Sequence, residues 1–120
     1  MSTEYVVGQR DQRPWGSWEV IAAGSGYAVK RIVVSAGQRL SLQRHAFRAE
    51  DWVLVAGAGR VTRGAEVLAV ASGDHVMIAR GDVHRIENPG PGDLVLIEVQ
   101  HGERLDENDI ERLDDDYGRR

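Results

Sequence analysis

The stretch GQRLSLQRH, residues 37–45, sets a glycine directly before an alternating segment. Glycine adopts the positive φ angles that tight turns need. From Leu40 onward apolar and polar residues alternate, as they do in a half-buried strand. Side chains two residues apart on a strand point to the same face, so the pattern predicts a turn followed by a strand that carries Gln43 and His45 side by side.

The same turn-and-strand pattern runs through the whole chain. Its 120 residues include 14 glycines and only three prolines, and short runs rich in Val, Ile and Leu lie between the glycines. The run LVLI at residues 94–97 is apolar throughout, which suits a strand of an inner sheet. The predicted strands are residues 15–21, 27–34, 40–44, 52–55, 60–63, 66–70, 75–78, 83–87 and 94–100. About nine short strands at regular spacing indicate an all-β sandwich, jelly roll or barrel.

Length and composition predict a single domain. A chain of 120 residues that is 42% hydrophobic can build one core. We expect an N-terminal arm at about residues 1–14, a barrel at about 15–101 and an acidic tail at about 102–120. In the tail, Asp106 is a candidate N-cap, and Ile110 and Leu113 lie three residues apart. This spacing predicts a short amphipathic C-terminal helix.

Several classes of function are excluded by composition. The chain has a formal net charge of −4, whereas nucleic-acid-binding proteins usually carry an excess of basic residues. The absence of cysteine rules out disulfides, thiolate nucleophiles and cysteine-ligated metals. The first twenty residues carry charges and no apolar core of a signal peptide, and no apolar run approaches the roughly 20 residues that span a bilayer. We therefore expect a cytoplasmic protein without a nucleic-acid or membrane partner.

Four polar residues form a candidate metal site. Gln43 and His45 share a strand face, Glu50 follows five residues later, and His84 lies just after a turn further along the chain. Two imidazoles, a carboxylate and an amide oxygen make a mixed nitrogen and oxygen set that suits a divalent ion. From spacing alone, a set of unrelated polar residues is an equally good interpretation.

Two glycine-framed patterns resemble a known family. The pattern G-x5-Q-x-H-x4-E-x6-G over residues 37–57 resembles the first cupin motif, with Gln43 where histidine is usual. The pattern G-x5-A-R-G-x2-H-x3-N over residues 73–88 resembles the second, with Ala79 where proline is usual. Cupins are small jelly-roll barrels, so the resemblance agrees with the strand pattern and predicts an all-β single cupin barrel with the short C-terminal helix.

A narrower resemblance covers almost the whole chain. The segments that carry it are RPWGSWE at 13–19, VKRI at 29–32, LSLQ at 40–43, RAE at 48–50, HRIENPG at 84–90, LIEVQ at 96–100, NDI at 108–110 and DYGR at 116–119. They resemble the type II phosphomannose isomerase domain, a cupin often fused behind a mannose-1-phosphate guanylyltransferase. The resemblance implies isomerisation between mannose 6-phosphate and fructose 6-phosphate. No glycine-rich nucleotide loop is visible, so synthesis of GDP-mannose by this chain is not expected.

The resemblance also implies a ligand set for one divalent metal ion. It assigns Gln43, His45, Glu50 and His84 as the ligands, with zinc as the first choice and iron, manganese, cobalt or nickel as alternatives. Phe47 and Asp51 depart from the family pattern, which has histidine at both positions. Because neither is one of the four ligands, metal binding is expected to survive, whereas the isomerase activity is expected to be weak.

Further residues are candidates for catalysis and for sugar-phosphate binding. Glu98 is the candidate base, and Lys30 and Arg85 are two further candidates for catalytic residues. The phosphate is assigned to Lys30, Arg48, Arg85 and Arg112, with Arg119 as a further tail candidate. For each of these charged residues the alternative to a functional role is a structural one, in which the side chain is paired with another charge or exposed to solvent. Trp15, Trp18 and Trp52 are expected to lie in the core or at a dimer contact.

Three functions compete at this point: the isomerase, a non-catalytic cupin that binds a sugar phosphate or a partner, and another metal-dependent cupin enzyme such as an epimerase or dioxygenase. The near full-length resemblance favours the isomerase over the last of these. We also predict a homodimer, because exposed edge strands and an N-terminal arm without a fold of its own are commonly covered by a second copy.

Overall fold

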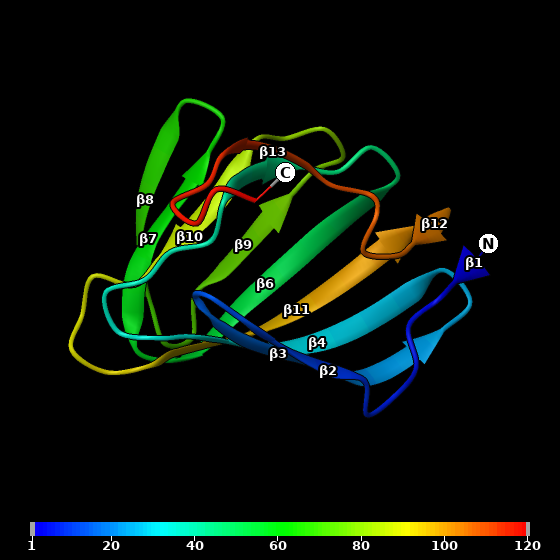
Figure 1. Cartoon of the computed structure of the whole chain (residues 1–120), viewed down its shortest axis with the longest axis horizontal. Helices are drawn as coiled ribbons and strands as arrows, with labels where there is room; N and C mark the ends of the chain where they lie inside the picture. Colours follow the sequence, from blue (N-terminus) through cyan, green and yellow to red (C-terminus); the bar gives the residue numbers. More distant parts are fainter. Residues whose placement is uncertain (1, 120) are drawn as a thin grey trace.

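The computed structural model describes residues 2–119, and the predicted arm and tail each extend one residue beyond this range. This part of the chain folds entirely into strands and connecting turns, and it contains no helix (Figure 1). No helix that could cross a membrane is therefore present among the described residues. The strands are β1 (Ser2–Thr3), β2 (Arg10–Arg13), β3 (Gly16–Gly24), β4 (Tyr27–Val34), β5 (Leu42–Arg44), β6 (Arg48–Ala56), β7 (Ala58–Arg63), β8 (Glu66–Ala71), β9 (His75–Ile78), β10 (His84–Glu87), β11 (Leu94–Gly102), β12 (Arg104–Leu105) and β13 (Glu111–Asp114).

Two antiparallel sheets face each other and make the jelly roll that the sequence predicts. The larger has the strand order β2-β3-β4-β11-β6-β9, and the smaller has β13-β5-β10-β7-β8. A short parallel pair, β1 with β12, closes one end. Neighbours within the sheets are far apart in sequence, since β11 lies between β4 and β6. Such crossovers are the mark of a jelly roll, in which the chain alternates between the two sheets.

Alternation along the long strands divides apolar core from outer surface. In β4, β6 and β11 every second residue is buried, so one face of each strand points between the sheets. Leu54, Leu96 and Val34 lie on this inner face and are fully buried. They belong to one hydrophobic cluster that also takes Val61 and Ile86 from the smaller sheet. Both sheets therefore share a single core.

The same inner face turns polar toward one end of the barrel. Glu98 pairs across the sheet with Lys30, and Gln100 pairs with Glu50, and all four side chains are buried. Burying charged groups is costly unless they are paired or bind a ligand. The barrel thus has an apolar end that stabilises the fold and a polar end that is available for chemistry.

The predicted C-terminal helix is wrong. Residues Glu111–Asp114 form β13, which pairs antiparallel with β5. The Asp106 side chain accepts a hydrogen bond from the backbone N–H of Asn108 at 2.8 Å, as an N-cap would, but it closes a turn rather than starting a helix. The free edge of β5 supplies backbone partners that a short isolated helix lacks, and Leu113 stays half exposed instead of packing on the barrel.

The N-terminal arm also differs from the prediction. Arg10–Arg13 form β2, which pairs with β3 of the same chain, and Tyr5 is buried in the core. The arm therefore has a place in its own barrel.

The close approach of β11 to the β5–β6 turn gives a test of this packing. A Cβ on Gly102 would lie 2.2 Å from the carbonyl oxygen of Phe47, which is backbone and cannot move aside. We expect Gly102→Ala to lower the free energy of unfolding by about 2 kcal/mol or more, measured by urea denaturation. Gly92→Ala is the matched control, because a Cβ there meets nothing within 4 Å. Its change should stay within about 0.5 kcal/mol, and equal effects of the two variants would contradict the packing described.

Candidate metal centre

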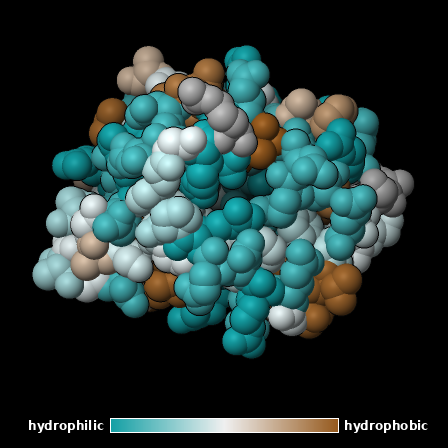
Figure 2. Space-filling view, in the orientation of Figure 1, coloured by the Kyte–Doolittle hydropathy of each residue, from teal (hydrophilic) through white to brown (hydrophobic). Residues whose placement is uncertain are grey.

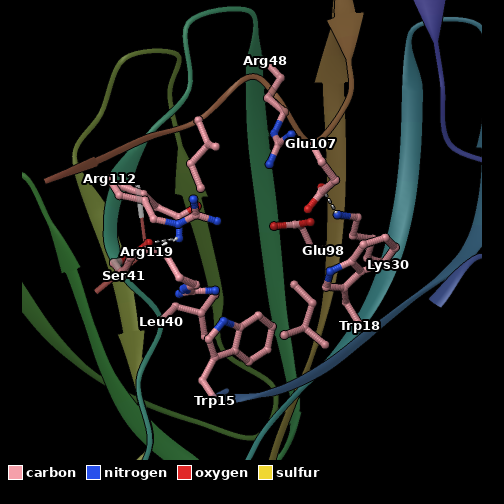
Figure 3. A pocket seen from close by; sticks show the side chains of 13 residues that line it. Trp15, Trp18, Lys30, Leu40, Ser41, Arg48, Glu98, Glu107, Arg112 and Arg119 are labelled. Carbon is pink, nitrogen blue, oxygen red and sulfur yellow. Dashed lines mark hydrogen bonds and ion pairs between the residues drawn. The ribbon is translucent and has the colours of Figure 1, made fainter. Parts of the chain in front are cut away.

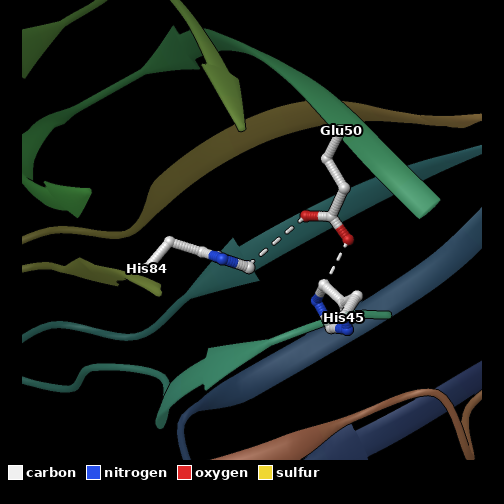
Figure 4. Close-up of side chains that lie close together, drawn as sticks. All are labelled: His45, Glu50 and His84. Carbon is white, nitrogen blue, oxygen red and sulfur yellow. Dashed lines mark ion pairs between the residues drawn. The ribbon is translucent and has the colours of Figure 1, made fainter. Parts of the chain in front are cut away.

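Three buried side chains converge at the polar end of the barrel (Figure 4). Glu50 projects inward from β6, His84 begins β10, and His45 directly follows β5. The Nε2 atom of His45 lies 3.3 Å from one Glu50 oxygen, and the Nε2 atom of His84 lies 3.8 Å from the other. Ligand atoms of the three residues all lie within 4.8 Å of one another, the only such group among residues 2–119. The sequence prediction of these three residues as one cluster is confirmed.

The ring orientation of both histidines suits a metal. His45 Nδ1 lies 2.6 Å from the carbonyl oxygen of Asp109, and His84 Nδ1 lies 2.8 Å from that of Asp82. A carbonyl oxygen only accepts, so each Nδ1 carries the proton and each Nε2 keeps its lone pair. Both lone pairs belong to the nitrogens that face Glu50. This arrangement, in which the far nitrogen is held by a hydrogen bond, is typical of metal-ligating histidines.

Charges around the cluster keep the ligands in their metal-binding forms. Burial lowers the pKa of His45 to about 4, so its imidazole is neutral at pH 7. Burial alone would raise the pKa of Glu50, but the positive charge of Arg48 opposes this effect, and the pKa is held well below its usual range. An ionised carboxylate beside two imidazole nitrogens is the donor set that zinc and related divalent ions bind. The three residues present therefore fit a divalent metal.

Two neighbours hold the Glu50 carboxylate in place. Arg48 Nε donates to one oxygen at 2.8 Å, and Trp52 Nε1 donates to the other at 3.0 Å. A carboxylate offers about four lone-pair positions, so both oxygens retain capacity for an ion. Arg48 and Trp52 lie on the same inner face of β6 as Glu50, at intervals of two residues.

Asp109 orients His45 in a way that the sequence did not reveal. Besides its carbonyl contact with the ring, its carboxylate accepts the backbone N–H groups of Ala46 and Phe47 at 2.8 and 2.9 Å. The sequence placed this residue in a helix, and its true partners lie more than sixty positions away along the chain. No local signal in the sequence marks such a contact.

Gln43, the fourth predicted ligand, lies beside the cluster. It is the cross-strand partner of His84, and its side-chain nitrogen donates to Ser41 Oγ at 3.0 Å. Its role as a metal ligand stays a prediction.

A small cavity of about 60 Å³, open to solvent, lies beside the metal centre. Figure 3 shows Arg112 and Arg119 on one side of it, with Lys30 and Glu98 across from them. The complete lining consists of Trp15, Trp18, Lys30, Ile32, Leu40, Ser41, Gln43, Arg48, Glu98, Glu107, Ile110, Arg112 and Arg119. Arg48 both lines this cavity and holds Glu50, so the cavity lies next to the metal centre, whose own three residues are not part of its lining.

Lys30 and Glu98 carry the unusual electrostatics of the cavity. Lys30 is buried, with its Nζ 4.0 Å from the ring centre of Trp18 and 2.7 Å from Glu107. Burial, and then the neighbouring charge of Glu50, raises the pKa of Glu98 to about 8. Glu98 can therefore hold a proton at neutral pH. Glu107 was not predicted, because the tail was interpreted as a helix.

The structure brings most of the predicted substrate residues together and leaves one out. Lys30, Arg48 and Arg112 line the cavity, as does the tail candidate Arg119. Arg85 is not part of the lining. Its guanidinium donates to the carbonyl oxygen of Leu40 at 3.0 Å and to the Asp114 carboxylate at 3.1 Å, so it fastens β13 to the barrel.

The two departures from the family pattern lie outside this cavity. Phe47 follows β5 in the turn before β6, half exposed, with the Arg104 guanidinium 4.7 Å from its ring centre. It lines a second hollow, on the side of His45 where Asn108 and Asp109 lie. Asp51 points away from the core and contacts His75 and His101. Phe47 therefore lies in a hollow that also borders His45, and it is not part of the lining of the first cavity.

Comparison with known proteins identifies the family. Residues 2–115 match the family described as mannose-6-phosphate isomerase C-terminal. The chain belongs to this family. Among solved structures, a cupin-2 domain from Rhodospirillum rubrum is similar with a TM-score of 0.67 and 27% identity, over 78% of this chain and 67% of that one. The capsular polysaccharide assembling protein CapF of Staphylococcus aureus, with a TM-score of 0.73 and 23% identity over 88% of this chain and 34% of that one, shares the fold.

The relatives of this chain are much longer proteins. The xanthan biosynthesis protein XanB of Xanthomonas campestris is 50% identical over 89% of this chain and 23% of its own length. The mannose-1-phosphate guanylyltransferase ManC of Salmonella typhimurium is 49% identical over 97% of this chain and 24% of its own. The alginate biosynthesis protein AlgA of Pseudomonas aeruginosa is 46% identical over 89% and 22%. The chain spans about a quarter of the length of these relatives.

These relatives correct the predicted function. The prediction that the chain interconverts mannose 6-phosphate and fructose 6-phosphate is wrong, because relatives at 43–50% identity are named as mannose-1-phosphate guanylyltransferases or as xanthan and alginate biosynthesis proteins, and none of these is named as an isomerase. The resemblance correctly located the family and the cupin fold. It did not identify the activity, since one fold serves many reactions.

Loss of a histidine tests the metal centre directly. We expect His84→Ala to reduce bound divalent metal by about tenfold or more, since removing a ligand exceeds the roughly 10–100-fold effects of residues around it. Elemental analysis of the purified protein measures this. The matched control is His75→Ala, on the outer side of the larger sheet, which should keep its metal. Equal metal content in the two variants would disprove the assignment.

The raised pKa of Glu98 predicts a specific pH dependence. Its pKa is about 8 in the folded protein and near 4.5 when unfolded, so its neutral form stabilises the fold at low pH and this contribution is lost as pH rises from about 4.5 through 8. After chelation of metal, the free energy of unfolding of the wild type should fall between pH 5 and pH 8.5, and it should fall by more than that of Glu98→Gln. Urea denaturation at the two values measures the difference. Glu66→Gln, an exposed change, should follow wild type, and parallel curves for wild type and Glu98→Gln would refute the prediction.

Proposed function

We propose that this chain is a metal-binding cupin domain that binds phosphorylated mannose, and that it supplies this binding site to the guanylyltransferase chemistry of its relatives. The observation that carries the proposal is the cavity beside the His45, Glu50 and His84 cluster, whose wall includes four cationic side chains. They are Lys30, Arg48, Arg112 and Arg119.

The charge and the chemistry of the cavity wall support a phosphorylated sugar as the ligand. Arginine and lysine bind phosphate through charge-assisted hydrogen bonds. Glu98 on the opposite wall offers oxygens that can bind sugar hydroxyls, and the edges of Trp15 and Trp18 add an apolar wall (Figure 3).

His45, Glu50 and His84 would hold the metal ion of this site. A divalent ion there supplies Lewis acidity and a fixed positive charge toward an oxygen of the bound sugar. Arg48 links the ion to the ligand, because the same guanidinium holds Glu50 and lines the cavity. Glu107 and Trp18 hold the Nζ atom of buried Lys30 at a defined place on the cavity wall.

The names of the relatives support the choice of mannose. ManC is named for mannose 1-phosphate, the substrate of guanylyl transfer. The chain spans about a quarter of that protein, so we propose for it the recognition of phosphorylated mannose and not the nucleotide chemistry. Calorimetric titration of the zinc-loaded protein with mannose 1-phosphate, mannose 6-phosphate, mannose and inorganic phosphate tests this. At least one sugar phosphate should bind about tenfold or more tightly than mannose.

A single arginine tests the cavity. Arg119→Ala should weaken binding of the sugar phosphate by about 10–100-fold, the value of one charge-assisted hydrogen bond. Arg60→Ala, an exposed change on β7 outside the cavity, is the matched control and should bind as wild type. Failure of every sugar phosphate to bind, or equal weakening in both variants, would reject the proposed function.

A further inference from the structure

The cavity beside the metal centre is too small to take a sugar phosphate without a change in its wall. Its volume of about 60 Å³ has room for a few water molecules, since one water needs roughly 10–15 Å³. Sites that bind small molecules usually measure about 300–1,000 Å³. Binding of a phosphorylated hexose therefore requires part of the cavity wall to move.

The second hollow is larger, and a short stretch of chain separates it from the cavity. Its volume is about 470 Å³, and its wall includes the metal-site residue His45. Ile110 is the only one of residues 2–119 that lines both spaces. Of the two residues that follow it, Glu111 lines the hollow and Arg112 lines the cavity. The chain at residues 110–112 therefore forms the partition between the two spaces.

The chain is anchored in the barrel on both sides of this partition. Asp109 is buried, and its carboxylate accepts two backbone N–H groups of the turn between β5 and β6 at 2.8 and 2.9 Å. On the other side, Tyr117 packs against the core, and its hydroxyl donates to Gln38. Residues 110–116 lie between these two anchors, and we call them the strap.

The strap itself is attached to the barrel mainly at the surface. Its strand β13 shares three residue pairs with β5, at the edge of the smaller sheet (Figure 1), and the register shifts between Arg112 and Asp114. Ion pairs with arginines of the barrel add to this pairing, and the carboxylates of Glu111, Asp114 and Asp116 that make them are exposed. The face of the molecule shown in Figure 2 is correspondingly mostly hydrophilic.

Attachments of this kind hold a segment weakly. Exposed ion pairs add little stability, and salt screens them further. Segments with few buried contacts open locally far more often than the whole protein unfolds. The strap is therefore the part of the cavity wall that can move while the barrel stays folded.

We propose that the strap is a gate, which opens to join the cavity and the hollow into one ligand site and then closes on the bound ligand. This inference rests on the proposed function, because the ligand is the phosphorylated mannose proposed there. The joined space borders His45 on one side and Lys30 and Arg48 on the other, so one ligand can reach both the metal centre and the cationic wall. On closing, the strap returns Arg112 to the cavity wall, where its charge meets the phosphate.

Amide hydrogen exchange of the full chain measures the opening without any ligand. The backbone N–H groups of β13 should be protected at least about 100-fold less than those of β11, which is a central strand. Sodium chloride at about 0.5 M should speed exchange in β13, because it screens the ion pairs of the strap, and should leave β11 unchanged. Equal protection of the two strands would overturn the gate, whether or not a sugar phosphate binds.

A disulfide across the strap tests whether the opening admits the ligand. The chain has no cysteine, so Arg44→Cys/Glu111→Cys introduces a single pair, at an ion pair between cross-strand partners of β5 and β13. Partners of this kind lie at the Cα separation that a disulfide needs. The probes are mannose 1-phosphate and mannose 6-phosphate, followed by stopped-flow fluorescence of Trp15 and Trp18 in the cavity wall. The oxidised, zinc-loaded protein should bind at least about tenfold more slowly than the same protein reduced with a phosphine.

The matched control is Arg63→Cys/Glu66→Cys. It replaces another ion pair between cross-strand partners, on β7 and β8, and neither residue lines the cavity or the hollow. Its oxidation should leave the binding rate unchanged. Equal rates for the oxidised and reduced strap variant, or equal slowing in the control, would overturn the gate. Failure of both sugar phosphates to bind the reduced protein, with β13 opening locally, would reject the proposed function and support the opening of the strap.

A change in the partition decides the matter if the disulfide does not form. Ile110→Ala removes the side chain that borders both spaces, and it should speed exchange in β13 by about tenfold. Leu113→Ala, a change on the same strand at a residue that is half exposed and lines neither space, should leave this exchange as in wild type. Equal exchange in the two variants would contradict the partition and with it the gate.

Discussion

The buried carboxylate of Glu50 is the constraint on which the polar end of this protein depends. An unpaired charge in a barrel interior would cost several kcal/mol. Contacts with Arg48, Trp52 and the imidazoles of His45 and His84 stabilise the Glu50 carboxylate and offset this cost. Arg48 in turn donates to the carbonyl oxygen of Asp106, which ties the tail segment to the same centre. Metal site, cavity wall and C-terminal segment are thus held by one network of charges.

The C-terminal segment completes the site as much as the barrel does. Asp109 fixes the ring of His45, Glu107 pairs with Lys30, and Arg112 and Arg119 line the cavity. The Tyr117 hydroxyl donates a hydrogen bond to Gln38, and Arg39 donates to Asp116, and these contacts fasten the rest of the segment to the barrel. A cupin barrel without this segment would keep Glu50 and His84 but would lose half of the cationic wall. The specificity of the site therefore depends on a part of the chain that lies outside the two cupin motifs.

The two faces of the larger sheet differ in chemistry. Its inner face carries the core at one end and Lys30, Glu50 and Glu98 at the other. Its outer face carries Asp51, which contacts His75 and His101. Because side chains alternate along each strand, residues of the two faces adjoin in sequence, as Glu50 and Asp51 do. Neighbouring residues can thus lie on separate faces without contact.

The sequence by itself determined the all-β fold, the approximate positions of nine of the strands and three metal-site residues, because alternation, glycine turns and motif spacing are local properties of the chain. It also grouped Lys30, Arg48 and Arg112 as substrate residues, and the structure brings these together in one cavity. Only the tertiary structure decided that the tail is a strand, because the edge of β5 supplies hydrogen-bond partners that no local pattern can indicate. The separation of Arg85 from the cavity, and the hold of Asp109 on His45, likewise follow from contacts between segments dozens of residues apart.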